Sequence, residues 1–213
     1  MPSKTFNITI DTQAFNQMTT KQKQIITAAI DLFAEKGYAN TSTKEIAAKA
    51  GVAEGNIFST FKNKRGLLAA IINPVQRAIF PTTNQGAGAV SPAPYESLHE
   101  FMTDFCRDRL AFLQANRQVI KIFVAEIIYN DKLRQSLIKD FPASNRCWLQ
   151  MAASLDQLKA QKLLVNWDNI KILKTIWSVM GGSALGYLFF DQPIKTTTLA
   201  QNVDTATRLL TYH

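Results

Sequence analysis

The sequence contains very few histidines and cysteines, the residues that typically bind zinc. Its 213 residues include two histidines, His99 and His213, and two cysteines, Cys106 and Cys147. None of these four has the short spacing of a zinc-binding motif, and the cysteines are interpreted as buried or partly buried thiols. A Cys–His pair could form only if folding brought His99 to one of the cysteines. The sequence therefore predicts no metal site and no cofactor.

Long apolar runs are also missing. The N-terminus lacks the apolar core of a signal peptide. The most apolar stretch, residues 175–190, is closed by Lys174 and Asp191 and is shorter than the ~20 residues that cross a bilayer. We therefore expect a soluble, cytoplasmic protein with no membrane partner. No carboxylate pair, nucleophile–base pair or glycine-rich phosphate loop stands out, so no catalytic residue is predicted and the protein is not expected to be an enzyme.

Positive charge is in excess. The net charge is +8 and the isoelectric point is about 9.5, which makes nucleic acid or an anionic membrane surface plausible partners. Residues 1–72 hold nine Lys and Arg against five Asp and Glu, while the rest of the chain holds fifteen against eleven. The excess per residue is therefore larger in the N-terminal third, as DNA binding requires.

The hydrophobic pattern has the period of amphipathic helices over most of the chain, and no stretch alternates like a strand. A first helix is expected from Thr20 to Gly37, a second after the capping pair Ser42 and Glu45, a third over 53–61, and a fourth after Asn63. Further helices are expected over 95–115, 117–129, 131–139, 143–162, 168–190 and 195–211. Residues 1–18 are interpreted as a mobile arm, and 81–94 as a loop because they collect proline, glycine and small polar residues. The predicted fold class is all-α.

Two short helices joined through Gly51 and Val52 have the sequence outline of a helix-turn-helix over residues 42–61. Val52, Ile57 and Phe61 are spaced for the inner face of this motif, which leaves small and polar residues on the outer face. Short capped helices with a glycine turn also occur in bundles that bind no nucleic acid, so the outline alone leaves both interpretations open.

The larger arrangement resembles the TetR family of bacterial transcriptional repressors. The residues that carry the resemblance are the Ala-x-x-Leu-Phe segment before Gly37-Tyr38, the Thr41-Ser42 entry, Ile46-Ala47, Ala50-Gly51-Val52 and Phe61-Lys62-Asn63-Lys64. The resemblance covers residues 20–72. It implies an N-terminal arm over 1–19, a three-helix helix-turn-helix DNA-binding domain over 20–72, and a larger helical ligand-binding and dimerisation domain over 73–213.

The resemblance also implies roles in DNA binding. Phosphate contacts are expected at the start of the second helix, base contacts at the start of the third, and a further phosphate contact at Lys64. The predicted DNA-binding residues are Ser42, Thr43, Lys44, Ala53, Glu54, Gly55, Asn56, Phe58, Ser59, Thr60, Lys62 and Lys64. Phe58 stands where the family commonly has a tyrosine that contacts a phosphate, and Ser59 stands where it often has an aromatic residue or histidine. These departures suggest that the lysines carry more of the affinity.

The C-terminal part matches the family only in its helical architecture, and by resemblance it should bind a small-molecule effector and form a homodimer. The small residues of 181–186 would let a second helix approach closely, although packing within the chain is an alternative. Predicted dimer-interface residues are Trp177, Gly181, Gly182 and Leu185. The predicted ligand-binding residues are Phe105, Arg109, Phe112, Phe123, Glu126 and Trp148. Ordinary core packing explains the aromatic residues among them equally well.

The favoured function is a ligand-responsive transcriptional regulator, a repressor that a small molecule releases from a palindromic double-stranded DNA operator. The alternative is an all-α small-molecule or lipid-binding protein, or an enzyme, whose basic N-terminal domain is incidental.

Overall fold

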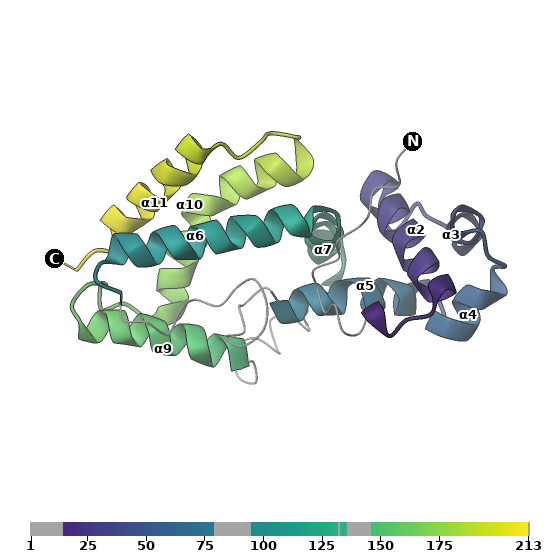
Figure 1. The fold of residues 1–213 in the computed structure, drawn as a ribbon, viewed down its shortest axis with the longest axis horizontal. Helices are drawn as coiled ribbons and strands as arrows, with labels where there is room; N and C mark the ends of the chain where they lie inside the picture. The colour runs from purple at the N-terminus through teal and green to yellow at the C-terminus, as the bar shows by residue number, and fades with distance from the viewer. Residues whose placement is uncertain (1–14, 79–94, 132, 136–145, 213) are drawn as a thin grey trace. The chain divides into compact units, whose positions relative to one another are not determined.

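The computed structural model describes residues 15–78, 95–131, 133–135 and 146–212, and every helix named below lies in these ranges. The predicted arm before residue 15, the predicted loop over 81–94 and most of the predicted helix 131–139 lie outside them. The described residues are α-helical with a single isolated bridge between Leu164 and Thr211, which confirms the all-α prediction (Figure 1).

The chain divides into two compact units. The first unit contains α2 (Thr20–Lys36), α3 (Thr43–Ala50), α4 (Gly55–Phe61), α5 (Lys64–Ala78) and α7 (Arg117–Tyr129). Helix α7 packs against both α2 and α5, so a helix from the middle of the chain completes this unit. The predicted DNA-binding domain, residues 20–72, is smaller than this structural unit, and its boundary at residue 72 stays a prediction.

Local signals fix the ends of the N-terminal helices. Thr19 and Gln22 form a capping box at the start of α2, with the Gln22 N–H donating to the Thr19 hydroxyl at 3.3 Å. Gly37, with a φ of 85°, ends the helix, and its N–H donates to the carbonyl of Phe33. The buried face of α2 carries Ile25, Ile26, Ala28, Ala29, Ile30 and Phe33, which form the centre of the unit's core.

The second unit contains α6 (Leu98–Ala115), α9 (Arg146–Ala160), α10 (Asn169–Phe189) and α11 (Thr196–Leu210). Helices α10 and α11 lie side by side (Figure 1). The buried Cys106 thiol of α6 contacts the Met180 sulfur of α10 at 3.4 Å, and burial raises its pKa to about 11. Cys106 is therefore the buried thiol that the sequence predicts, whereas the side chain of Cys147 lies outside the described residues. Within the described ranges, no helix is long and apolar enough to cross a membrane.

Candidate nucleic-acid interface

The start of α3 is stabilised by a capping box within its first turn and by an ion pair with α2. The Ser42 hydroxyl accepts from the Glu45 N–H at 3.1 Å, and the Ser42 N–H donates to the Glu45 carboxylate at 2.8 Å. Lys36 of α2 forms an ion pair with the same carboxylate. The hydrogen bond from Lys36, followed by those from Ser42, lowers the pKa of Glu45 to about 2. The capping box is as the sequence predicts, and it leaves Ser42 and Lys44 exposed and Thr43 half-buried.

The turn after α3 requires glycine. Gly51 has a φ of 66° and a ψ of 33°, the left-handed conformation that glycine adopts without a steric penalty. Its N–H and that of Val52 bond to carbonyls of the last turn of α3. The chain then reverses into α4, which begins at Gly55 rather than at Ala53 as the sequence suggests.

Helix α4 is anchored through one fully buried side chain and leaves most of its surface outside. Ile57 is completely buried, while Val52 and Phe61, also predicted for the inner face, are half-buried. The exposed residues of the segment are Ala53, Gly55, Phe58, Ser59 and Thr60. Phe58, a large apolar side chain, is 48% exposed. Glu54 and Asn56 are half-buried at the first turn.

A hydrogen bond joins the two helices of the motif. The Thr43 hydroxyl donates to a carboxylate oxygen of Glu54 at 2.5 Å. This bond connects the first turn of α3 to the residue before α4. The sequence predicts Glu54 as a DNA-binding residue, and the structure adds a partner within the protein, Thr43, for one of its oxygens.

The predicted phosphate-binding lysines occupy two different environments. Lys62 is exposed and has a φ of 66° at the C-terminal end of α4, a conformation that non-glycine residues rarely adopt. The Lys64 ammonium donates to the carbonyls of Tyr38 and Thr41 at 2.9 and 2.8 Å and lies 4.3 Å from the centre of the Tyr38 ring. Lys64 therefore connects the start of α5 to the turn that precedes α3.

An open groove brings these elements together. Its volume is about 540 Å³, and its walls include the α2–α3 turn, the first turn of α3, Phe58 of α4 and Lys64 of α5. Four of the residues predicted to contact DNA, Ser42, Thr43, Phe58 and Lys64, therefore border one depression at the N-terminus of α3, whereas the predicted base-reading residues 53–56 are not part of its wall.

Comparisons with known proteins agree with this arrangement. The family described as bacterial regulatory proteins, tetR family, matches residues 25–71. The N-terminal domain of this chain belongs to the tetR family. The uncharacterized HTH-type transcriptional regulator YvkB of Bacillus subtilis (strain 168) is 50% identical over 56 residues, which are 26% of this chain and 30% of YvkB.

Two further matches cover more of the chain. The probable HTH-type transcriptional regulator YttP of Bacillus subtilis (strain 168) is 27% identical over 125 residues, 59% of this chain and 58% of YttP. These matches thus span less than two thirds of either relative. A solved tetR-family regulator from Pseudomonas syringae pv. tomato str. DC3000 shares the fold, with a TM-score of 0.66 and 17% identity over 90% of this chain and 95% of that one.

The predicted ligand-binding residues are divided between the two units of the chain. Phe105, Arg109 and Phe112 lie on α6 in the second unit, while Phe123 and Glu126 lie on α7 in the first. Arg109 is buried and paired with its neighbour Asp108, and its guanidinium lies 5.4 Å from the centre of the Phe112 ring. Trp148 is on α9, and its side chain lies outside the described residues. Their joint role in one pocket stays a prediction.

The predicted dimer-interface residues lie on one face of α10. Trp177 is 42% exposed and Leu185 47% exposed, and Gly181 and Gly182 lie one turn from each. A Cβ atom added to either glycine would meet no atom within 4 Å. Packing within the chain therefore does not require glycine at these two positions.

Proposed function

We propose that this protein is a DNA-binding transcriptional regulator that reads its operator with α4. The observation that carries this proposal is the motif's construction. Two helices are held to each other by the Thr43–Glu54 bond and to the core by Ile57, while the outer face of α4 carries small and polar side chains. A helix of this kind can enter the major groove because its outer face lacks bulk and offers hydrogen-bonding groups to base edges.

The lysines supply the contacts to the DNA backbone in this proposal. Lys44 and Lys62 are exposed and reach phosphates directly. Lys64 uses two of the three N–H donors of its ammonium on the carbonyls of Tyr38 and Thr41, which leaves the third for a phosphate. The same two bonds orient the N-terminus of α3, where Ser42 and Thr43 meet a second phosphate.

In this proposal the protein binds its operator as a homodimer. The open face of α10 combines apolar side chains with glycines that only a second helix would require. A second copy of the same face would form a twofold-symmetric contact, and the two α4 helices would then address the two halves of a palindromic operator.

Regulation by a small molecule is the remaining part of the proposal. The protein acts as a repressor whose effector binds the helical part of the chain and lowers operator affinity. Thermodynamic reciprocity requires that operator lower effector affinity by the same factor. Titrating effector with and without operator measures that factor, and equal affinities in both titrations would contradict effector-controlled release.

Selection of bound sequences from random DNA with the purified full-length chain tests the central proposal. We expect a palindromic consensus whose half-sites are about one helical turn apart. A matched selection with Ser59→Glu, which adds a charge to the exposed face of α4, should lose the consensus. Recovery of sequences without any consensus from the parent protein would contradict the proposal.

A further inference from the structure

A second cavity lies in the first unit and has Tyr38 in its wall. Its volume is about 270 Å³, and it lies among α5, the α2–α3 turn and the segment after α7. A cavity of 150 Å³ lined by aliphatic side chains is large enough for benzene. The space is therefore sufficient for one small ring with a polar substituent.

The cavity wall is mainly aliphatic. Leu68, Ala69 and Ile72 line it from α5, and Leu133 lines it from the segment after α7. Leu68 and Ile72 are almost completely buried, so their surfaces toward the cavity belong to the core rather than to an exposed patch. An apolar wall with a few polar groups is the usual composition of a small-molecule site.

Four polar residues complete the lining: Tyr38, Arg65, Asn73 and Asn130. Tyr38 is fixed by an edge-on contact with Phe33 and by the Lys64 ammonium. Burial, followed by the nearby Glu126 carboxylate, raises the pKa of Tyr38, so its hydroxyl stays protonated and can donate a hydrogen bond. Asn130 is held in place because its side-chain oxygen accepts from the Leu133 N–H at 3.1 Å.

Among the described residues that line the cavity, Arg65 is the only charged one. Its side chain is exposed, and its charge is close enough to lower the pKa of Tyr38. A guanidinium offers a planar pair of N–H donors that matches a carboxylate. One such group balances one negative charge, which favours a monocarboxylate over a phosphate dianion.

We infer that this cavity is a binding site for a small aromatic or aliphatic monocarboxylate, with the carboxylate on Arg65 and the apolar body between Ile72 and Leu133. None of the residues predicted for the effector is in the lining, but Glu126 borders the site, since it hydrogen-bonds Asn130 and its charge raises the pKa of Tyr38. Its occupant would touch α5, Tyr38 and the end of α7 together.

Occupancy has a direct consequence for DNA binding, and this step rests on the proposed function. Arg65 follows Lys64 at the start of α5, beside the proposed phosphate contacts. A bound carboxylate neutralises the Arg65 charge and thereby lowers DNA affinity by about two- to threefold at low salt.

Binding is tested on the full-length chain by methyl NMR, with benzoate as the probe and benzamide as its uncharged analogue. A ligand this small is expected to bind with a Kd of about 1 mM. Benzoate should shift the methyl signals of Leu68, Ile72 and Leu133 and should bind about tenfold more tightly than benzamide, because its bond to Arg65 is charge-assisted.

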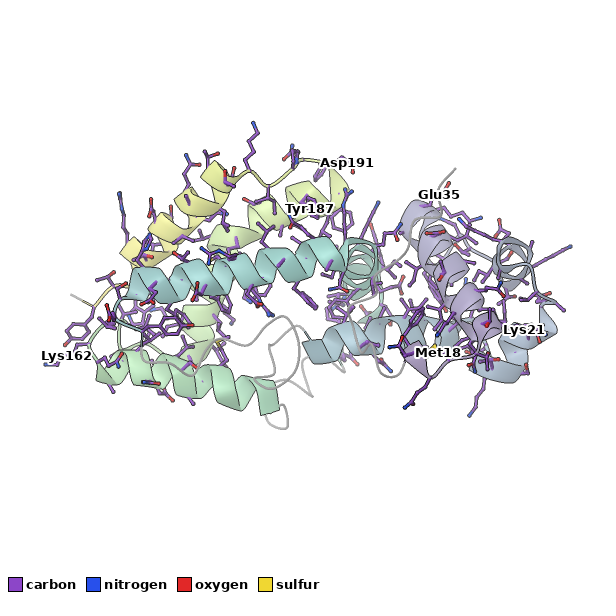
Figure 2. The ribbon with its side chains drawn as sticks, viewed as in Figure 1. Met18, Lys21, Glu35, Lys162, Tyr187 and Asp191 are labelled. Carbon is purple, nitrogen blue, oxygen red and sulfur yellow. The ribbon has the colours of Figure 1, made fainter. Side chains whose placement is uncertain are left out.

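Three variants sharpen this experiment. Arg65→Gln should reduce the affinity for benzoate to that for benzamide. Ala69→Phe should fill the cavity and abolish the binding of both benzoate and benzamide. Lys21→Gln, which removes an exposed cation on α2 far along the chain from the lining, is the matched control and should bind as the parent does (Figure 2). Equal benzoate affinity in the parent and Arg65→Gln would overturn the site, as would methyl shifts confined to other residues.

A DNA-binding measurement distinguishes this inference from the proposed function. Saturating benzoate should weaken DNA binding by the parent and leave Arg65→Gln unaffected, whereas an equal effect on both would overturn the coupling. A chain that binds no DNA would contradict the proposed function, and the methyl titration would still decide whether the site exists.

Discussion

At the scale of single residues, Lys62 combines an unfavourable backbone conformation with an exposed charge. Its φ of 66° costs free energy in any residue with a Cβ atom, so glycine would be more stable there. We expect Lys62→Gly to raise the free energy of unfolding by about 0.5–1 kcal/mol while weakening DNA binding. Urea denaturation and a DNA titration measure the two effects.

Lys62→Ala separates the two effects, because it removes the charge and keeps the Cβ atom. We expect it to lose as much DNA affinity as Lys62→Gly without the gain in stability. Each lost phosphate contact should also reduce the slope of log K against log salt by about 0.9 per subunit. An unchanged slope in both variants would mean that the Lys62 side chain contacts no phosphate.

Glu54 is the acid on the proposed reading face, and one of its oxygens accepts from Thr43. The second oxygen can accept from the amino group of a cytosine, which is the usual base partner of a carboxylate. Glu54→Gln keeps an acceptor for Thr43 and removes the charge. We expect higher non-specific affinity, and about 1–3 kcal/mol less discrimination at one position of each half-site. Identical selected sequences for the variant and the parent would leave Glu54 with only its bond to Thr43.

At the scale of helices, the caps were predictable because their signals are local. Ser42 and Glu45 are three residues apart, and Gly51 follows the last buried position of α3, so neighbouring residues determine both ends. The bonds from Lys64 to Tyr38 and Thr41 were not predictable in the same way, since they join residues 26 and 23 positions apart. The buried stripe of α7 predicts only that this helix is covered, not that α2 and α5 cover it.

The start of α3 should respond to acid. The pKa of Glu45 lies at about 2 in the folded chain, below its unfolded value of about 4.3. A lowered folded pKa means that the carboxylate stabilises the fold above the unfolded value, and this contribution is lost as pH falls from about 4.3 to 2. The protection of the first-turn amides of α3 against hydrogen exchange, taken relative to their intrinsic exchange rates at each pH, should therefore fall as pH is lowered across this window.

Glu45→Gln is the matched variant for this prediction. Glutamine retains the capping box with Ser42 and cannot ionise or pair with the Lys36 charge. Amide exchange at the start of α3 should then lose its additional acid dependence between pH 4.3 and 2. The same acid response in the variant and the parent would assign it to another carboxylate, such as Asp31, which pairs with Lys49 at 3.2 Å.

At the scale of the whole molecule, the sequence predicted the fold class and the two helices of the helix-turn-helix motif, but not how the remaining helices are grouped. The aromatic residues of α6 and α7 look alike in sequence, and they belong to different units. Sequence periodicity shows which face of a helix is buried without showing its partner, so a ligand site assembled from residues such as Phe105 and Phe123 could not be derived from it.

The proposed homodimer can be tested at Gly182. No atom lies within 4 Å of the position of a Cβ atom there, so the chain alone has room for a side chain. In a twofold contact, however, Gly182→Arg would bring a charged side chain from each subunit into an apolar interface. An unpaired buried charge costs about 3–5 kcal/mol, so the dimer Kd should rise at least about 100-fold. Sedimentation equilibrium measures this change directly.

Ala153→Arg is the control, because it adds the same side chain at an exposed position of α9 in the same unit. This variant should remain dimeric, and both variants should retain the helical circular dichroism of the parent. Loss of the dimer in Gly182→Arg should also weaken binding to the full operator far more than binding to a half-site, since a monomer presents only one α4. An undiminished dimer in Gly182→Arg would exclude this face of α10 from the interface and would direct attention to the exposed Leu209 and Tyr212 beyond it.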